Sequence, residues 1–173
     1  MTVPPLSSIF DLSDLSDAGA EIAVRPNAEQ RARLAGWAGV DAVDRFDATV
    51  SLKRRTQNRF AYDATLDADV VQSCVVTLEP VRSHLALTVS RALHLSHFPA
   101  RAGIAADELS PAADEGPEEI EDPRYDLAAP LLEEFVLAID PYPRARGVVF
   151  RQEPEQAPQE SPFAALKALK RGS

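Results

Sequence analysis

A cluster of basic side chains, Lys53, Arg54, Arg55 and Arg59, is the part of this sequence best suited to bind a nucleic acid. Guanidinium groups bind phosphate through paired hydrogen bonds, and their planes stack on unpaired bases. The pattern therefore predicts an RNA contact at these four residues. Alternatively, basic residues beside a turn only keep the turn hydrated and prevent edge-to-edge strand pairing. The sequence does not decide between these two interpretations.

Side chains that could hold a metal or carry out catalysis do not form a recognisable motif. Cys74 is the single cysteine, which excludes an internal disulfide and a site built from several thiolates. His94 and His97 point to opposite faces of a strand end, and Glu133 and Glu134 diverge on a helix. The sequence also lacks glycine-rich phosphate loops, nucleophile elbows and metalloprotease motifs. We therefore expect no enzyme, no metal, no cofactor and no small-molecule substrate.

The net charge of −9 is concentrated in one acidic segment. Residues 107–122 hold eight acidic side chains and no basic one, so this stretch accounts for all but one unit of the net charge. Acidic runs interrupted by proline and glycine are usually hydrated, which predicts a flexible loop at about residues 105–122. The loop is either a spacer or a surface that attracts basic proteins.

Alternating apolar and polar residues predict the elements that carry the basic cluster. Residues 46–52 and 60–70 alternate with a period of two, and a third such run covers residues 81–95. These runs predict a long antiparallel hairpin and meander with one buried face. Two shorter strands are expected before them, at residues 9–15 and 21–25.

Two helices are expected to cover the buried face. The first begins at the cap residue Asn27, with Gln30 completing a capping box, and ends at Gly39. The second begins after the cap residue Asp126 and ends near Asp140, which precedes a proline. Their apolar stripes are Leu34, Trp37 and Ala38 in the first helix, and Leu127, Leu131, Leu132, Phe135, Ala138 and Ile139 in the second.

The expected fold class is α+β, a mainly antiparallel sheet built on a long hairpin or meander and packed by two helices. We expect a single domain at residues 1–150, followed by a linker and a short C-terminal helix at residues 151–173. The N-terminus lacks a signal-peptide pattern and no apolar run is long enough to span a bilayer, so a cytoplasmic protein with no membrane contact is expected.

Three segments resemble the YceD family of bacterial proteins. They are the long hairpin, CVVTLEPV at residues 74–81, and YDLAAPLLEEFVLAIDPYPR at residues 125–144, and a terminal PFAALKALK helix is also similar. The resemblance implies a role in accumulation of 23S rRNA or in large-subunit assembly, and no enzymatic reaction. Many members carry a second cysteine where this chain has Thr77, so zinc or disulfide chemistry is not expected at Cys74.

The resemblance also suggests partners. The leading hypothesis is binding of ribosomal RNA or a pre-50S particle, and the alternative is an acidic adaptor or chaperone for a basic ribosomal protein. A second basic group follows the last helix, and we expect this tail either to dock on such a partner or to be an unstructured terminus. Its members are Arg144, Arg146, Arg151, Lys167, Lys170 and Arg171, with Phe163, Leu166 and Leu169 as an apolar edge.

Overall fold

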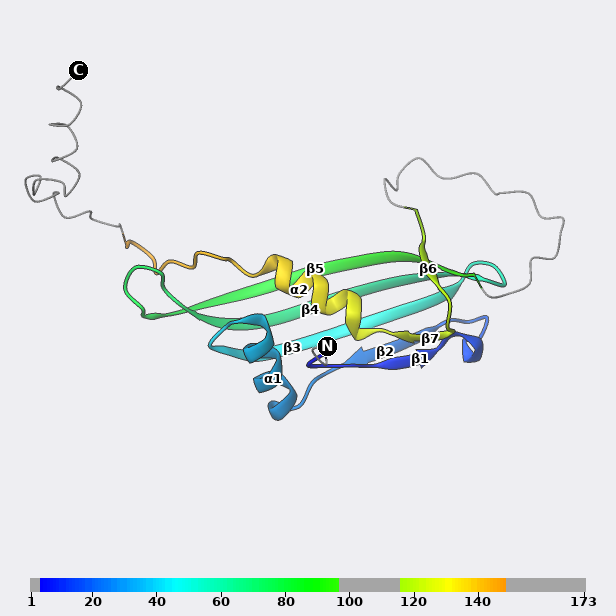
Figure 1. Ribbon diagram of the computed structural model, residues 1–173, viewed down its shortest axis with the longest axis horizontal. Helices are drawn as coiled ribbons and strands as arrows, with labels where there is room; N and C mark the ends of the chain where they lie inside the picture. The colour runs from blue at the N-terminus through cyan, green and yellow to red at the C-terminus, as the bar shows by residue number, and fades with distance from the viewer. Residues whose placement is uncertain (1–3, 97–115, 149–173) are drawn as a thin grey trace, which may run out of the picture.

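The computed structural model describes residues 4–96 and 116–148, and within them the chain has the predicted α+β fold. A five-stranded sheet in the order β2-β3-β4-β5-β6 carries two helices, and β1 and β7 form a separate two-stranded sheet (Figure 1). The elements are β1 (Ile9–Asp11), β2 (Ala20–Val24), α1 (Ala28–Ala38), β3 (Ala42–Arg54), β4 (Arg59–Ser73), β5 (Pro80–Leu95), β6 (Glu118–Ile120), β7 (Arg124–Asp126) and α2 (Ala128–Ala138).

The long meander predicted from the alternating residues is confirmed. Strands β3, β4 and β5 are antiparallel and run nearly the whole length of the molecule (Figure 1). Cross-strand rows such as Val50, Ala64 and Val89 are buried, whereas the intervening row of Thr49, Thr65 and Thr88 lies on the opposite face. The period of two thus places one face in the core and leaves the other, which we call the outer face, open to solvent.

Helix α1 begins and ends as predicted, but one of its predicted core residues is exposed. Asn27 accepts a hydrogen bond from the Gln30 backbone N–H at 2.9 Å, the Gln30 side chain accepts from the Asn27 N–H at 2.8 Å, and Gly39 ends the helix with φ 70°. Trp37 is 42% exposed, which contradicts its predicted place in the core. Ala35 is buried beside Leu34 instead, so the side of α1 that is covered in its packing on β3 differs from the predicted side.

Helix α2 covers the apolar face of the sheet with the predicted residues. Leu127, Leu131 and Phe135 are fully buried, and the Phe135 ring meets Phe46 of β3 edge-on with centroids 5.4 Å apart. The predicted cap position is wrong by one residue, since Leu127 is the N-cap. The Asp126 carboxylate nevertheless accepts from the Ala128 N–H and also from the Ser8 N–H, which joins the N-terminal segment to the start of the helix.

Two other predictions are corrected. Residues 9–15 are not one strand: β1 ends at Asp11, whose side chain caps a turn of 3-10 helix at Leu12–Asp14. The predicted loop at residues 105–122 is not loop throughout, because Glu118–Ile120 form β6, which is paired with β5 in parallel. Residues 105–115 of that loop and the predicted C-terminal helix lie outside the described residues. No helix within residues 4–96 and 116–148 is long and apolar enough to cross a membrane.

Candidate nucleic-acid interface

The predicted basic cluster lies where β3 turns into β4, at one end of the sheet (Figure 1). The backbone of the turn is held by hydrogen bonds from the N–H groups of Arg55 and Thr56 to the carbonyl of Arg59, at 2.8 and 3.1 Å. The Thr56 hydroxyl donates to the Asn58 side chain at 3.2 Å. The turn is therefore a defined structure that presents its side chains from a fixed backbone.

Arg54 does not share the environment of the other three basic residues. Its Nη2 donates to the carbonyls of Leu12 and Leu15 at 3.1 and 2.9 Å, and its guanidinium lies 5.1 Å from the centre of the Phe60 ring. These contacts join the N-terminal 3-10 turn to the hairpin. In this arrangement Arg54 stabilises the fold, and its donors are directed at the protein rather than at a ligand.

Lys53, Arg55 and Arg59 are exposed at this end of the sheet, and we call them the tip cluster. Lys53 and Arg59 both lie on the outer face, because Lys53 is paired with Ala61, two residues from Arg59 on β4. Diagonal neighbours of this kind are about 7–8 Å apart. Among the described residues, none of the salt bridges involves a member of the tip cluster. Their charges are thus available to an anionic partner.

One flank of the tip cluster is bordered by a polar network that the sequence did not predict. His94 of β5 lies opposite Arg59, and its two ring nitrogens lie 2.9 Å from Asn58 Nδ2 and 2.8 Å from Glu119 Oε1. Glu119 belongs to β6, so a carboxylate of the acidic segment is held beside the turn. Local sequence carries no signal for this contact, because it depends on the pairing of β5 with both β4 and β6.

The two described members of the second basic group, Arg144 and Arg146, lie at the opposite end of the sheet (Figure 1). Arg144 and Arg146 are exposed in the segment after α2, which packs on the turn between β4 and β5 through a hydrogen bond from the Val75 N–H to the Pro143 carbonyl. Strand β5 has 16 residues and joins the two ends, which places Arg144 and Arg146 roughly 50 Å from the tip cluster. These two arginines and the tip cluster do not form one surface. Phe163, Lys167 and Lys170 of the predicted tail lie outside the described residues.

A protein-family model described as "Large ribosomal RNA subunit accumulation protein YceD" matches residues 62–170. The chain belongs to the YceD family. Neither the curated proteins nor the solved structures gave a match. The matched range includes the turn after β4 and the whole of α2, whereas Lys53, Arg55 and Arg59 precede it. The case for the tip cluster therefore depends on its geometry and charge, independently of YceD family membership.

The turn between β4 and β5, within the YceD match, surrounds the single cysteine with hydrogen-bond donors. Cys74 is buried, and its Sγ accepts from the N–H groups of Val76 and Ala145 at 3.5 and 3.3 Å. The Thr77 hydroxyl, followed by the N–H groups of Ala145, Thr77 and Val76, lowers the pKa of the Cys74 thiol to about 6, against a smaller opposing effect of burial. Within the described residues no group of three or more His, Cys, Asp and Glu could hold a metal ion.

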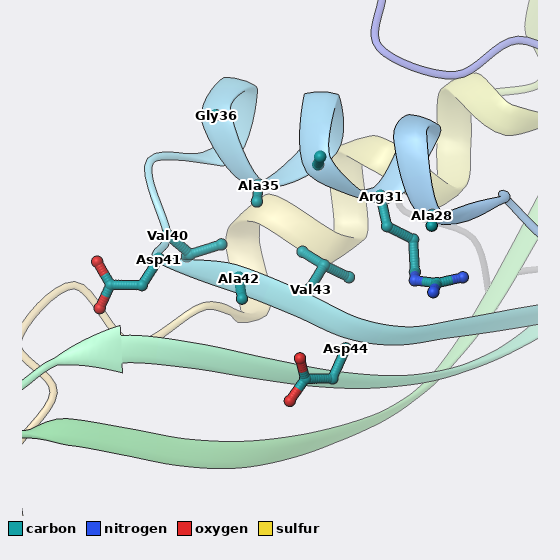
Figure 2. A pocket seen from close by; sticks show the side chains of 10 residues that line it. Ala28, Arg31, Ala35, Gly36, Val40, Asp41, Ala42, Val43 and Asp44 are labelled. Atoms are coloured by element: carbon teal, nitrogen blue, oxygen red, sulfur yellow. The ribbon is translucent and has the colours of Figure 1, made fainter.

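A hollow of about 460 Å³ lies between α1 and the start of β3 (Figure 2). Its charged lining residues, Arg31, Asp41 and Asp44, point in different directions and each has a partner elsewhere. Arg31 donates to the Pro26 carbonyl, Asp41 accepts from the Ser73 hydroxyl, and Asp44 pairs with Arg82. A binding site needs polar groups that converge on the ligand. These three side chains do not converge on the hollow, so together they do not form such a site.

Proposed function

We propose that this chain is a non-catalytic, cytoplasmic ribosome-biogenesis factor that supports accumulation of 23S rRNA or assembly of the large subunit. The chain belongs to the YceD family, and the description of that family supports the ribosomal role. In this proposal the chain binds ribosomal RNA or a pre-ribosomal particle through the tip cluster of Lys53, Arg55 and Arg59.

The observation that carries the RNA-binding part is the exposure of these three cations on a fixed turn. The internal contacts of Arg54 with Leu12 and Leu15 hold the end of β3, so the tip cluster loses little conformational freedom of the backbone when it meets a phosphate chain. The carboxylate of Glu119, which is held beside the turn, is paired with His94, whose Nδ1 lies 2.8 Å from its Oε1. Exposed arginine and lysine then contribute a salt-dependent attraction to RNA phosphates.

The direct test is a triple variant, Lys53→Ala, Arg55→Ala and Arg59→Ala, titrated with a large-subunit rRNA fragment at several salt concentrations. The slope of log affinity against log salt should decrease by about 0.7 for each lost contact with a single-stranded phosphate. Arg25→Ala with Arg33→Ala is a matched control, since it removes exposed arginines that belong to neither basic group. Equal affinity and slope for the wild type and the triple variant would contradict the assignment of the tip cluster.

The ribosomal role is tested separately in cells. Depletion of the protein should reduce the 50S peak when ribosomal particles are separated by sedimentation, and expression of the wild type should restore it. Rescue by the triple variant would indicate that the role does not depend on the tip cluster. A normal 50S peak after depletion would contradict the ribosomal role itself.

A further inference from the structure

Among the described strands, one edge of the main sheet has no partner over most of its length. Strand β5 is paired with β4 from Pro80 to His94, but on its other side β6 is paired only with Leu93–Leu95. No other described strand is paired with β5, so the edge from Arg82 to Ala92 has no strand beside it among residues 4–96 and 116–148. Figure 1 shows β5 along this border of the sheet, with β6 at one end of it.

Two hydrogen bonds establish which backbone groups of β5 face outward. The Leu95 N–H donates to the Asn58 carbonyl on the β4 side, and the Ser96 N–H donates to the Ile120 carbonyl on the β6 side. The register of β4 with β5 is unbroken, so this alternation continues along the strand. The N–H and C=O groups of the even-numbered residues from Arg82 to Ala92 therefore point away from β4, as a template for another strand.

An apolar strip accompanies this edge on the helix side of the sheet. Leu85 and Leu87 are only half-buried, unlike the corresponding residues of β4. Leu137 of α2 is 79% exposed, and it lies on the same side of the helix as Glu133 and Glu134, which contact Arg91 of β5. A strand added beside β5 would place its alternate side chains against Leu85, Leu87 and Leu137.

Charge favours a basic occupant. The side chain of Glu133 is 68% exposed above the edge, and Asp63, Asp67 and Asp69 lie on the outer face of the adjacent strand. The nitrogen-bearing side chains of the edge already contact carboxylates: Arg82 contacts Asp44, His84 contacts Asp67 and Asp69, and Arg91 contacts Glu133 and Glu134. Because the acidic side chains of this region outnumber these partners, its surroundings remain acidic. Two copies of a chain with net charge −9 repel each other, which disfavours edge-to-edge pairing with a second copy.

We propose that the edge of β5 from Arg82 to Ala92 binds an extended, basic segment of another protein, which adds to the sheet as a further strand. Apolar residues at alternate positions of that segment pack on Leu85, Leu87 and Leu137, and its lysine or arginine residues face the acidic surroundings. Strand β6 already occupies the same edge at Leu93–Leu95, so the site continues a pairing that this edge supports. This inference is independent of RNA binding by the tip cluster.

The test uses the full-length protein and a fluorescent synthetic peptide that alternates lysine with valine. Ala86→Pro removes one outward N–H at a position where an edge strand accepts proline, and Ala86→Val keeps that N–H as the matched control. We expect the peptide to bind wild type and Ala86→Val alike, and to bind Ala86→Pro about tenfold more weakly, as loss of about one hydrogen bond predicts. A peptide with glutamate in place of lysine should bind at least about tenfold more weakly than the lysine peptide.

Hydrogen exchange provides a second readout that does not depend on the proline variant. On addition of the lysine peptide, the amides of His84, Ala86 and Thr88 should become protected, while those of Leu85 and Leu87, already bonded to β4, should change little. Affinity that is equal for Ala86→Pro and Ala86→Val would overturn the proposal. So would protection of the even-numbered amides in the free monomer, or a wild-type dimer that Ala86→Pro dissociates. Unchanged RNA binding by Ala86→Pro would separate this site from the tip cluster.

Discussion

Replacing Arg54 by alanine should lower the free energy of unfolding by about 3 kcal/mol. The variant loses hydrogen bonds to the carbonyls of Leu12 and Leu15, each contributing on the order of 1–1.5 kcal/mol at a half-buried site. It also loses the cation–π contact with Phe60, which contributes about 0.5–1 kcal/mol. Because Leu12 and Leu15 are buried, loosening the N-terminal turn would also expose apolar surface.

Urea unfolding monitored by circular dichroism measures this difference, and Arg55→Ala is the matched control. Arg55 is exposed, so its replacement should change stability by no more than about 0.5 kcal/mol. In RNA binding the order of the two variants should be reversed. Arg55→Ala should weaken the affinity for RNA, whereas folded Arg54→Ala should largely retain it. If Arg54→Ala were as stable as Arg55→Ala, the structural role assigned to Arg54 would be wrong.

Three further predictions concern other parts of the chain. Because the pKa of Cys74 falls to about 6 in the folded state from an ordinary value near 9, its thiolate contributes stability fully above pH 9. That contribution is lost as the pH falls toward 6, so the stability difference between wild type and Cys74→Ala in urea should shrink over this range. A constant difference would contradict the assigned pKa. Gly19→Ala should destabilise the fold by about 1–3 kcal/mol, since φ is +84° and the new Cβ would lie 2.6 Å from the Leu52 carbonyl oxygen; a melting temperature equal to that of wild type would argue against this. Phe135→Ala should lower the free energy of unfolding in urea by about 3–5 kcal/mol, because the ring is fully buried against Phe46. A decrease below about 1 kcal/mol would mean that α2 is not docked as described.

Local pattern was sufficient to predict the central sheet and the start of α1. Side chains in a strand alternate between two faces, so the apolar residues of β3 and β4 identified the buried face without knowledge of their partners. The capping box of Asn27 and Gln30 is likewise a contact between residues three apart. The features predicted correctly depend on neighbours in the sequence.

Errors arose where a contact joins distant segments. Residues 9–15 do not form one strand because β1 finds its partner in β7, which begins at Arg124. Trp37 is exposed because the packing of α1 against β3 buries Leu34 and Ala35 instead. Periodicity reports that one side of an element is apolar, but it does not report which partner covers that side.

The candidate sites divide in the same way. The sequence by itself determined that Lys53, Arg55 and Arg59 gather at a turn, since a hairpin brings its own ends together. Only the tertiary structure decided that Arg54 is directed into the protein and that Arg144 and Arg146 lie at the opposite end of the sheet. It alone also showed that β5 has an edge without a partner among the described strands. The reason is physical: the direction of a side chain and the exposure of a backbone group depend on strand order and helix docking, which arise from contacts between residues far apart in the chain.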